Sequence, residues 1–277
     1  MRSRSAPAES GRAGIGLGSA SAIVVASMVG AGVFTTSGFL LADLGSPSWV
    51  LAAWVVGALI ALCGALCYGA VARALPGSGG EYHYLSQAAH PVAGFLAGWV
   101  SLLAGFAAPA AASALGLQAY LGPALGEGVR AEWIGTVAIC AAGALHGLRV
   151  APGIWVQNCA VLAKLGALLT FIILGAVVLI AHGAAPSTTA ATVSLPEPVF
   201  AAFAASLVWV SFSYSGWNAA VYLGAEVRDP ARNLPRALLL GLGVVAALYL
   251  ALHLVGRASA PAGLRAGRAD VVAAAAE

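Results

Sequence analysis

Residues 28–38 read MVGAGVFTTSG, and they lie in the middle of an apolar stretch long enough to cross a lipid bilayer. Glycines stand at positions 30, 32 and 38, and Thr35, Thr36 and Ser37 precede the last of them. In hydrocarbon every backbone N–H and C=O group needs a partner, so helix-weakening residues are tolerated only where the freed groups are satisfied in another way. We therefore expect this stretch to interrupt a membrane helix and to present backbone groups to a ligand.

The composition of the whole chain indicates a membrane protein. Of its 277 residues, 61% are hydrophobic and only 8% are charged, whereas an ordinary soluble domain has roughly 25% charged residues. Apolar stretches that can span the hydrocarbon layer recur along the chain. We predict an all-α polytopic membrane protein with seven spans, over residues 15–39, 48–71, 92–121, 131–149, 154–182, 198–224 and 237–256.

The arginines between the spans predict which way the chain crosses the membrane, because cytoplasmic loops are enriched in Lys and Arg. With the N-terminus inside, most arginines fall in the cytoplasm. We therefore predict a multi-pass protein of the cell membrane, with a cytoplasmic tail at 1–13, a transmembrane domain at 14–256 and an extracellular tail at 257–277. The arginines before the first span also fit a secretory signal peptide, but the length of that span and the spans behind it favour a permanent anchor.

The polar residues argue against several other classes of protein. The four cysteines all fall within predicted spans, so we expect no disulfide framework. The membrane topology accounts for the net charge of +3, and we expect the lipid bilayer rather than a nucleic acid as the large partner. The chain has neither an HExxH zinc motif nor a GxSxG nucleophile elbow, so we predict no enzyme, no metal site and no cofactor.

Two smaller features are interpreted as structural. The loop after the second span reads ALPGSGGEYHYL over residues 74–85, where Ser78 and Glu81 fit a capping box that starts a helix at the cytoplasmic surface. His146, His182 and His253 fall near the ends of predicted spans, and we expect them at the membrane interface.

A second interruption is predicted in the sixth span, whose centre reads FSYSGWN over residues 212–218. Five spans separate the start of the first span from the start of the sixth, and an odd number of crossings reverses the direction of the chain. The two interrupted helices therefore run antiparallel, as in a transporter built from inverted repeats. We predict a first repeat over residues 15–182 and the start of a second over 198–256. Such paired interruptions indicate a binding site at the membrane midplane.

Interrupted helices offer backbone groups of both polarities. If the chain unwinds around residues 30–32, the outer half-helix begins near Val33 and directs unpaired N–H groups at the membrane centre, where they suit a carboxylate. The inner half-helix ends near Ser27 and Met28, and its freed carbonyls suit an ammonium group. Together these groups match the backbone of an amino acid, and the sixth span repeats the arrangement before Gly216. The alternative explanation is that the glycines only let helices pack closely.

Lys164 is the only lysine of the chain, and it lies inside the fifth predicted span. A charge at the centre of a membrane helix costs roughly 2.5 to 3.5 kcal/mol on insertion scales. Snorkelling to the interface is the structural alternative, but Lys164 lies about 15 Å deep at 1.5 Å per residue. We hypothesise that its ammonium group binds the open carbonyls of the first span, where a sodium ion could otherwise sit. A buried lysine can alternate between charged and neutral forms, which would couple proton exchange to that helix.

Side chains of the sixth span supply further candidates. Asn218, Tyr222 and Glu226 recur every four residues, on one face of an α-helix that leads to the cytoplasm. Asn218 is a candidate lining residue, whereas Glu226 is expected only at the interface. Phe212 and Trp217 are large rings beside the predicted break and could cover a bound ligand, although ordinary packing explains either ring taken alone.

Four stretches carry a resemblance to a known family: SMVGAGVF at 27–34, ALPGSGGEYHYL at 74–85, FSYSGWN at 212–218 and EVRDPARNLPRA at 226–237. With a lysine in the fifth span, they resemble the amino acid-polyamine-organocation superfamily, especially bacterial relatives of the L-type amino acid transporters. The resemblance implies a five-plus-five inverted-repeat fold and alternating-access transport of amino acids, by proton coupling or exchange rather than with sodium.

The resemblance also implies a site for a small-molecule amino acid at the two breaks, with Phe212 as a gate and Lys164 as the coupling residue. The predicted substrate-binding residues are Ser27, Met28, Gly30, Ala31, Gly32, Val33, Phe212, Ser213, Tyr214, Ser215, Gly216 and Asn218.

The chain departs from the family pattern in two ways. Heteromeric members carry a cysteine between the third and fourth spans for a disulfide to a heavy chain, and residues 122–131 contain none, so we expect no such partner. The chain also ends after the seventh span, where the family continues into further helices, so we expect a truncated permease with two of the five helices of the second repeat. The alternative functions are a membrane sensor that binds an amino acid without transporting it and an inactive remnant.

Overall fold

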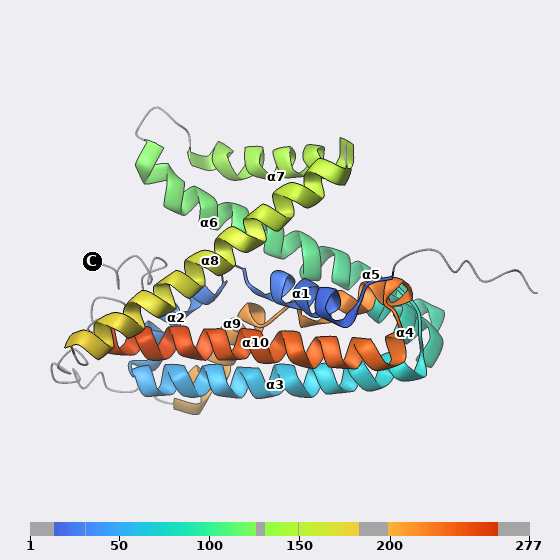
Figure 1. Cartoon of the computed structure of the whole chain (residues 1–277), viewed down its shortest axis with the longest axis horizontal. Coiled ribbons are helices and arrows are strands. Elements are labelled where there is room, and N and C mark those ends of the chain that lie inside the picture. Colours follow the sequence, from blue (N-terminus) through green and yellow to red (C-terminus); the bar gives the residue numbers. More distant parts are fainter. Residues whose placement is uncertain (1–13, 31, 126–130, 149, 183–198, 260–277) are drawn as a thin grey trace, which may run out of the picture.

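The computed structural model describes residues 14–30, 32–125, 131–148, 150–182 and 199–259, and these ranges are almost entirely helical (Figure 1). The elements in chain order are α1 (Leu17–Met28), α2 (Gly32–Leu44), α3 (Pro47–Ala74), α4 (Gly80–Ala88), α5 (Pro91–Val100), the π-helix η1 (Ser101–Ala107), α6 (Ala108–Leu125), α7 (Ala131–Leu148), α8 (Val150–His182), α9 (Val199–Ser213), the 3-10 helix η2 (Trp217–Glu226) and α10 (Pro230–Ser259).

Four of the described helices are long and apolar enough to cross a membrane: Pro47–Ala74, Pro91–Gln118, Asn158–Ala181 and Pro230–Gly256. They confirm an all-α polytopic membrane protein and correspond to the second, third, fifth and seventh predicted spans. The first and sixth predicted spans are each divided into two shorter helices, as the glycine clusters indicated. The fourth forms α7, whose apolar part, Trp133–Leu145, is shorter than a membrane span. The predicted tails lie outside the described residues except at 257–259.

The helix of the seventh span extends beyond the predicted apolar stretch. That stretch starts at residue 237, but α10 begins at Pro230 and continues through Pro235. Proline is tolerated at the first helical position, but inside a helix it lacks the N–H that would bind the carbonyl four residues earlier. Here that carbonyl belongs to Ala231, and Nε of Arg73 on α3 donates to it over 3.1 Å. A side chain of another helix therefore replaces the missing backbone donor.

The helix of the fifth span also begins before the predicted apolar stretch, since α8 starts at Val150 and the stretch at residue 154. Pro152 falls in the first turn of this helix, where a backbone N–H has no partner within the helix and its loss costs nothing. In the third span, the π-helical segment η1 joins α5 to α6, and no feature of the sequence predicted it.

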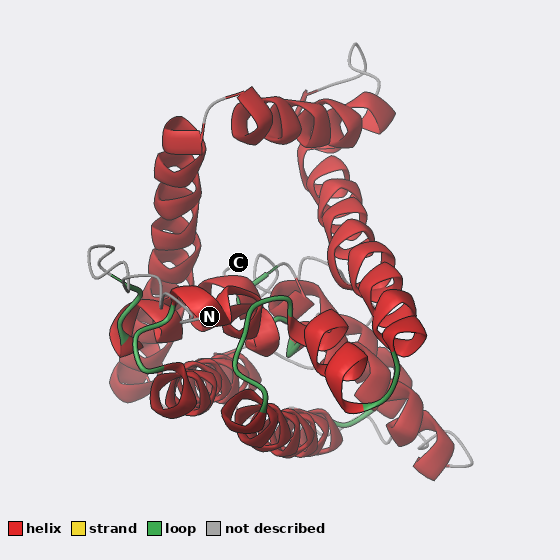
Figure 2. Ribbon diagram, turned by 90° about the vertical axis from the view of Figure 1, so that its right-hand side faces the viewer, coloured by secondary structure: helices red, strands yellow, loops and turns green. Residues whose placement is uncertain are grey.

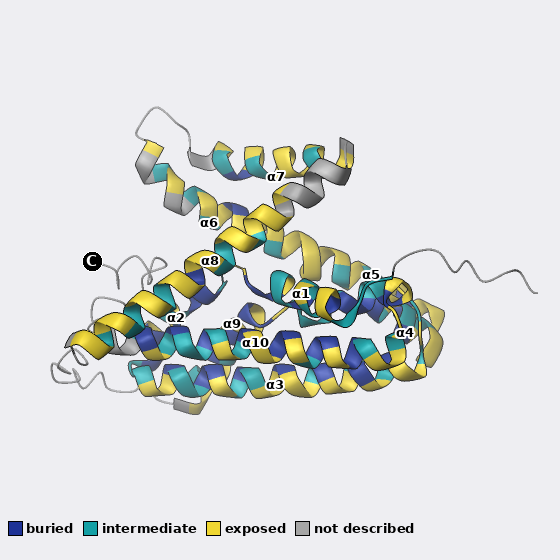
Figure 3. Ribbon diagram, in the orientation of Figure 1, coloured by how far each residue is buried: buried dark blue, intermediate teal, exposed yellow. Residues whose placement is uncertain are grey.

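The core lies where α10 runs beside α3 and α1 (Figure 1). Figure 3 shows buried residues concentrated on these helices, whereas α6, α7 and α8 are mostly exposed. In the side view of Figure 2, the helices in the lower part pack closely, whereas the helices in the upper part lie well apart from one another. Small residues permit the close contacts: a Cβ on Gly69 of α3 would lie 3.0 Å from the Cβ of Pro235 on α10.

Candidate functional site

The first break separates α1 from α2. α1 ends at Met28, and the N–H of Val29 makes the last bond, to the carbonyl of Val25 over 3.1 Å. Gly30 forms a bend, and α2 begins at Gly32. The hydrogen-bond ladder of a continuous helix is therefore interrupted at the predicted place. The last carbonyls of α1 and the first N–H groups of α2 consequently lack helical partners.

The second break separates α9 from η2. The N–H of Tyr214 still binds the carbonyl of Val210 over 2.9 Å, but Ser215 binds only three residues back, to Phe212, over 3.1 Å. Gly216 then takes a φ of +96°, a conformation that a residue with a side chain rarely adopts. This glycine ends α9 and turns the chain into η2, which confirms the second predicted break.

The two breaks touch each other. A Cβ on Gly216 would lie 2.7 Å from the carbonyl oxygen of Ser27, and a Cβ on Gly32 would lie 2.8 Å from Oγ of Ser213. The hydroxyls of Thr36 and Ser213 are hydrogen-bonded over 2.9 Å, so α2 and α9 are also joined just beyond the breaks. Two glycine positions from different halves of the chain thus bring the freed backbone groups into one place.

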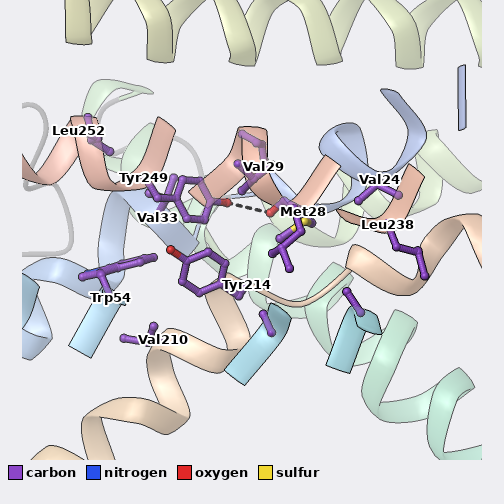
Figure 4. Packing of buried hydrophobic residues seen from close by; sticks show 14 of the residues in the cluster. Val24, Met28, Val29, Val33, Trp54, Val210, Tyr214, Leu238, Tyr249 and Leu252 are labelled. Atoms are coloured by element: carbon purple, nitrogen blue, oxygen red, sulfur yellow. Dashed lines mark hydrogen bonds between the residues drawn. The ribbon is translucent and has the colours of Figure 1, made fainter. Parts of the chain in front are cut away.

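Tyr249 of α10 lies against both breaks (Figure 4). Its hydroxyl donates to the carbonyl of Met28 over 2.9 Å and lies 3.4 Å from the carbonyl of Ser213. Its ring is fully buried and packs against Tyr214 and Trp54. We did not predict this residue, although a lone tyrosine in an apolar span is a signal that could have identified it.

Lys164 of α8 reaches the end of α1. Its Nζ donates to the carbonyl oxygen of Ala26 over 2.6 Å, which confirms the predicted contact with the open carbonyls of the first span. Ala26 lies two residues before the end of α1, among the last carbonyls of the helix, which have no backbone donor within it, so the ammonium group supplies a donor that the helix lacks. Whether Lys164 couples proton movement to transport stays a prediction.

The predicted site residues differ in how they are placed. Ser27, Gly30, Phe212 and Ser215 are exposed around the breaks, whereas Met28, Val33, Ser213 and Tyr214 are buried. The buried residues belong to the core or bond within it, so they can offer only backbone groups to a ligand. Ala31 lies outside the described residues.

The predicted capping box was wrong. In the structure Gly79 precedes α4, and no side chain caps that helix. Oγ of Ser78 instead accepts a bond from the N–H of Ala225 in η2 over 2.9 Å. Gly79 and Gly80 have φ values of +113° and +55°, which only glycine adopts easily. With this turn before α4, Ser78 contacts η2 and does not cap α4.

Glu81 carries the main contact between this loop and η2. Its Oε1 accepts from the hydroxyl of Tyr68 on α3 over 2.9 Å and from Nδ2 of Asn218 over 2.5 Å. Its Oε2 accepts from the hydroxyl of Tyr222. One carboxylate therefore joins three elements, and it uses one of the two N–H donors of the Asn218 amide. The carbonyl oxygen and the second N–H are the groups that Asn218 can offer to a ligand.

The helix type of η2 also differs from the prediction. Residues spaced by four share a face of an α-helix, but η2 is a 3-10 helix with three residues per turn. Asn218 and Tyr222 still meet at Glu81, whereas Glu226 uses its backbone carbonyl to accept from Ile15 over 2.8 Å. Trp217 packs edge-on against Tyr68 with ring centroids 4.9 Å apart, which supports the packing explanation for this ring.

Comparison with known proteins agrees with this geometry. The sequence pattern of a family described as "Amino acid permease" matches residues 15–276. The chain belongs to the amino acid permease family. Among its relatives in this family, the serine/threonine exchanger SteT of Bacillus subtilis (strain 168) is 31% identical over 242 residues, which are 85% of this chain and 52% of SteT.

Mammalian permeases are similar to the same degree. The b(0,+)-type amino acid transporter 1 of Homo sapiens is 30% identical over 246 residues, which are 86% of this chain and 50% of the relative. The large neutral amino acids transporter small subunit 2 of Oryctolagus cuniculus is 32% identical over 250 residues, 85% of this chain and 45% of the relative. The chain therefore spans about half the length of the curated permeases it matches.

Proposed function

We propose that the chain contains the amino-acid-binding part of a secondary transporter of the cell membrane, with a cytoplasmic N-terminus and no enzymatic activity. Transport would proceed by alternating access, either coupled to protons or by exchange. The relatives named as amino acid transporters and exchangers support this proposal, because they match most of the chain.

The contact between the two breaks is the observation that carries the proposal. Ser27 lies at the carbonyl end of α1 beside Gly216, and Gly32 opens the amide end of α2 beside Ser213. An amino acid bound beside this contact would direct its carboxylate to the N–H end of α2 and its ammonium to the carbonyls of α1. The carbonyls of Ala26 and Met28 already accept one bond each but have a second lone pair.

The connections around the breaks suit a hinge. The inner pieces are held together, since Ile15, just before α1, pairs with Glu226 and Arg228, which flank the end of η2, over 2.8 and 2.9 Å. The outer pieces α2 and α9 are joined by Thr36 and Ser213. Each pair can therefore tilt as a unit about the unwound residues, which would expose the bound amino acid to either side in turn.

The first experiment measures binding and uptake with the same preparation. We expect the chain in lipid nanodiscs to bind at least one of ¹⁴C-labelled serine, leucine or lysine, and proteoliposomes to accumulate it. Binding without accumulation would indicate the sensor function instead. The absence of binding to every amino acid of a full panel would contradict the site.

A pair of variants tests whether the breaks form the site. Gly216→Ala should reduce binding more than tenfold, because the positive φ strains alanine and the new Cβ would meet the carbonyl of Ser27 at 2.7 Å. Gly18→Ala on α1 is the control, since nothing lies within 4 Å of the added carbon. Equal losses in the two variants would mean that the effect is not local to the break.

A further inference from the structure

His253 of α10 lies outside the predicted binding residues, yet both nitrogens of its ring have neighbours. Nδ1 lies 2.6 Å from the carbonyl oxygen of Tyr249, one turn earlier on the same helix. Nε2 is within hydrogen-bonding distance of the hydroxyl of Ser37 on α2. The imidazole therefore links α10 to the half-helix that begins at the first break.

The chemistry of these neighbours determines which nitrogen of the ring carries a hydrogen. A carbonyl oxygen only accepts, so Nδ1 carries a hydrogen in every protonation state. In the neutral ring Nε2 is then the acceptor, and the Ser37 hydroxyl donates to it. In the charged ring Nε2 donates instead, and the same hydroxyl turns to accept. The site can hold either form without moving the ring.

Two contacts of the ring are stronger with an imidazolium than with a neutral imidazole. The ring of Trp54 on α3 lies 4.3 Å from the imidazole centroid at 39°, within the roughly 6 Å over which an aromatic face attracts a cation. A bond donated by an imidazolium is also roughly twice as strong as one between neutral groups. Protonation therefore strengthens the link between α2 and α10.

Among the side chains that the structure describes near His253, the titratable ones are phenols. Tyr249 precedes it on α10, and Tyr214 of α9 packs against Tyr249 and against Trp54. Both phenols are neutral at physiological pH. Ser37 and Trp54, the contacts from α2 and α3, do not titrate, and the carboxylate of Asp43 lies six residues further along α2 on an exposed residue.

We propose that His253 is a proton-binding site that fastens α2 to α10 more tightly when it is charged. Tyr249 connects this site to the breaks, because its carbonyl holds Nδ1 while its hydroxyl binds Met28 at the end of α1. The effect on transport rests on the function proposed above: acid pH favours the arrangement described here and slows the movement of α2.

Long-range ¹H–¹⁵N NMR of the ¹⁵N-histidine-labelled chain in nanodiscs tests the site itself, with His253→Gln to assign the signal. We expect the neutral ring to carry its hydrogen on Nδ1 and to gain a second proton between about pH 5 and 8. His90 serves as the reference, because its Nδ1 accepts from the N–H of Val92 over 3.2 Å and its neutral hydrogen is therefore on Nε2. A neutral His253 with its hydrogen on Nε2, or no titration in this range, would overturn the proposal.

Two further comparisons separate the site from the transport function. Ser37→Ala should weaken proton binding by His253 roughly tenfold, since the charge-assisted bond is lost; unchanged binding would overturn the link to α2. In proteoliposomes, His253→Gln should be less inhibited by acid than His90→Gln, and identical pH profiles would overturn the effect on α2. If the unmodified chain shows no uptake, the proposed function fails, while the NMR titration still decides the proton site.

Discussion

Lys164 and Tyr249 show how single side chains complete an interrupted helix. Each donates to a carbonyl in the last turn of α1, Lys164 to Ala26 and Tyr249 to Met28, and each comes from a different helix. A buried carbonyl without a donor would cost about 1 to 3 kcal/mol, so these two contacts make the break possible. The same contacts place a cation and a hydroxyl beside the proposed substrate.

Lys164→Met should remove the part of the pH dependence of amino acid uptake that comes from Lys164, because the variant keeps the apolar stem but has no proton to exchange. Uptake at acid pH should fall about tenfold or more as the contact with Ala26 is lost. The measurement is initial uptake between pH 5 and 8. Gly166→Ala, two residues further along α8 with open space around it, is the matched control. An unchanged pH profile would remove Lys164 from the coupling role.

Tyr249→Phe should lower the stability of the protein by about 1 to 2 kcal/mol, because the carbonyl of Met28 loses its donor inside the core. Thermal unfolding in detergent should therefore show a lower Tm. Tyr82→Phe provides the comparison, since Tyr82 is 53% exposed. If both variants unfold at the temperature of the unmodified chain, the hydroxyl of Tyr249 has no structural role.

At the scale of the elements, the two broken helices could be predicted from residues close together in the sequence. Clustered glycines in apolar spans and a single buried lysine were enough to predict both breaks and the bond from α8 to α1. The role of Glu81 was not predictable in the same way, because Asn218 and Tyr222 bind it from an element 137 and 141 residues away in the sequence. A capping box is a local pattern, and the long-range contacts of Glu81 prevailed over it.

Glu81→Gln should loosen η2. The amide has one accepting oxygen in place of two, so it cannot accept from Tyr68, Asn218 and Tyr222 together. Amide hydrogen exchange within Trp217–Glu226 should become roughly tenfold faster. Glu226→Gln is the control, because that residue is exposed and contacts Ile15 through its backbone. Exchange that stays as slow as in the unmodified chain would show that Ser78 and the glycine loop hold η2 without the carboxylate.

At the scale of the whole molecule, α10 and α3 form the support against which the broken helices pack. α10 contacts α1, α3 and η2, and α3 contacts α2, α9 and η2, so every broken piece touches at least one of these two helices. The sequence predicted the long helices from their apolar length. It did not predict their neighbours, because an apolar helix face suits lipid and protein equally well.

Gly241 and Gly243 of α10 offer a test of this support within one helix. A Cβ on Gly241 would lie 2.5 Å from Cγ1 of Val24 and 3.1 Å from the carbonyl oxygen of Ser21, whereas nothing lies within 4 Å of a Cβ on Gly243. Gly241→Ala should therefore push α10 away from α1 and lower stability by about 1 to 3 kcal/mol, as overpacking does. Gly243→Ala should be neutral or raise stability by up to about 1 kcal/mol, since alanine favours the helix.

The two variants should differ from each other both in thermal unfolding and in amino acid binding. Because α1 ends at the first break, displacing it moves the carbonyl of Ser27 away from Gly216, and Gly241→Ala should lose binding as well as stability. Gly243→Ala should keep both. A Gly241→Ala variant that unfolds early but binds normally would mean that the breaks hold their geometry without α10, and that the contacts between α2 and α9 alone position the site.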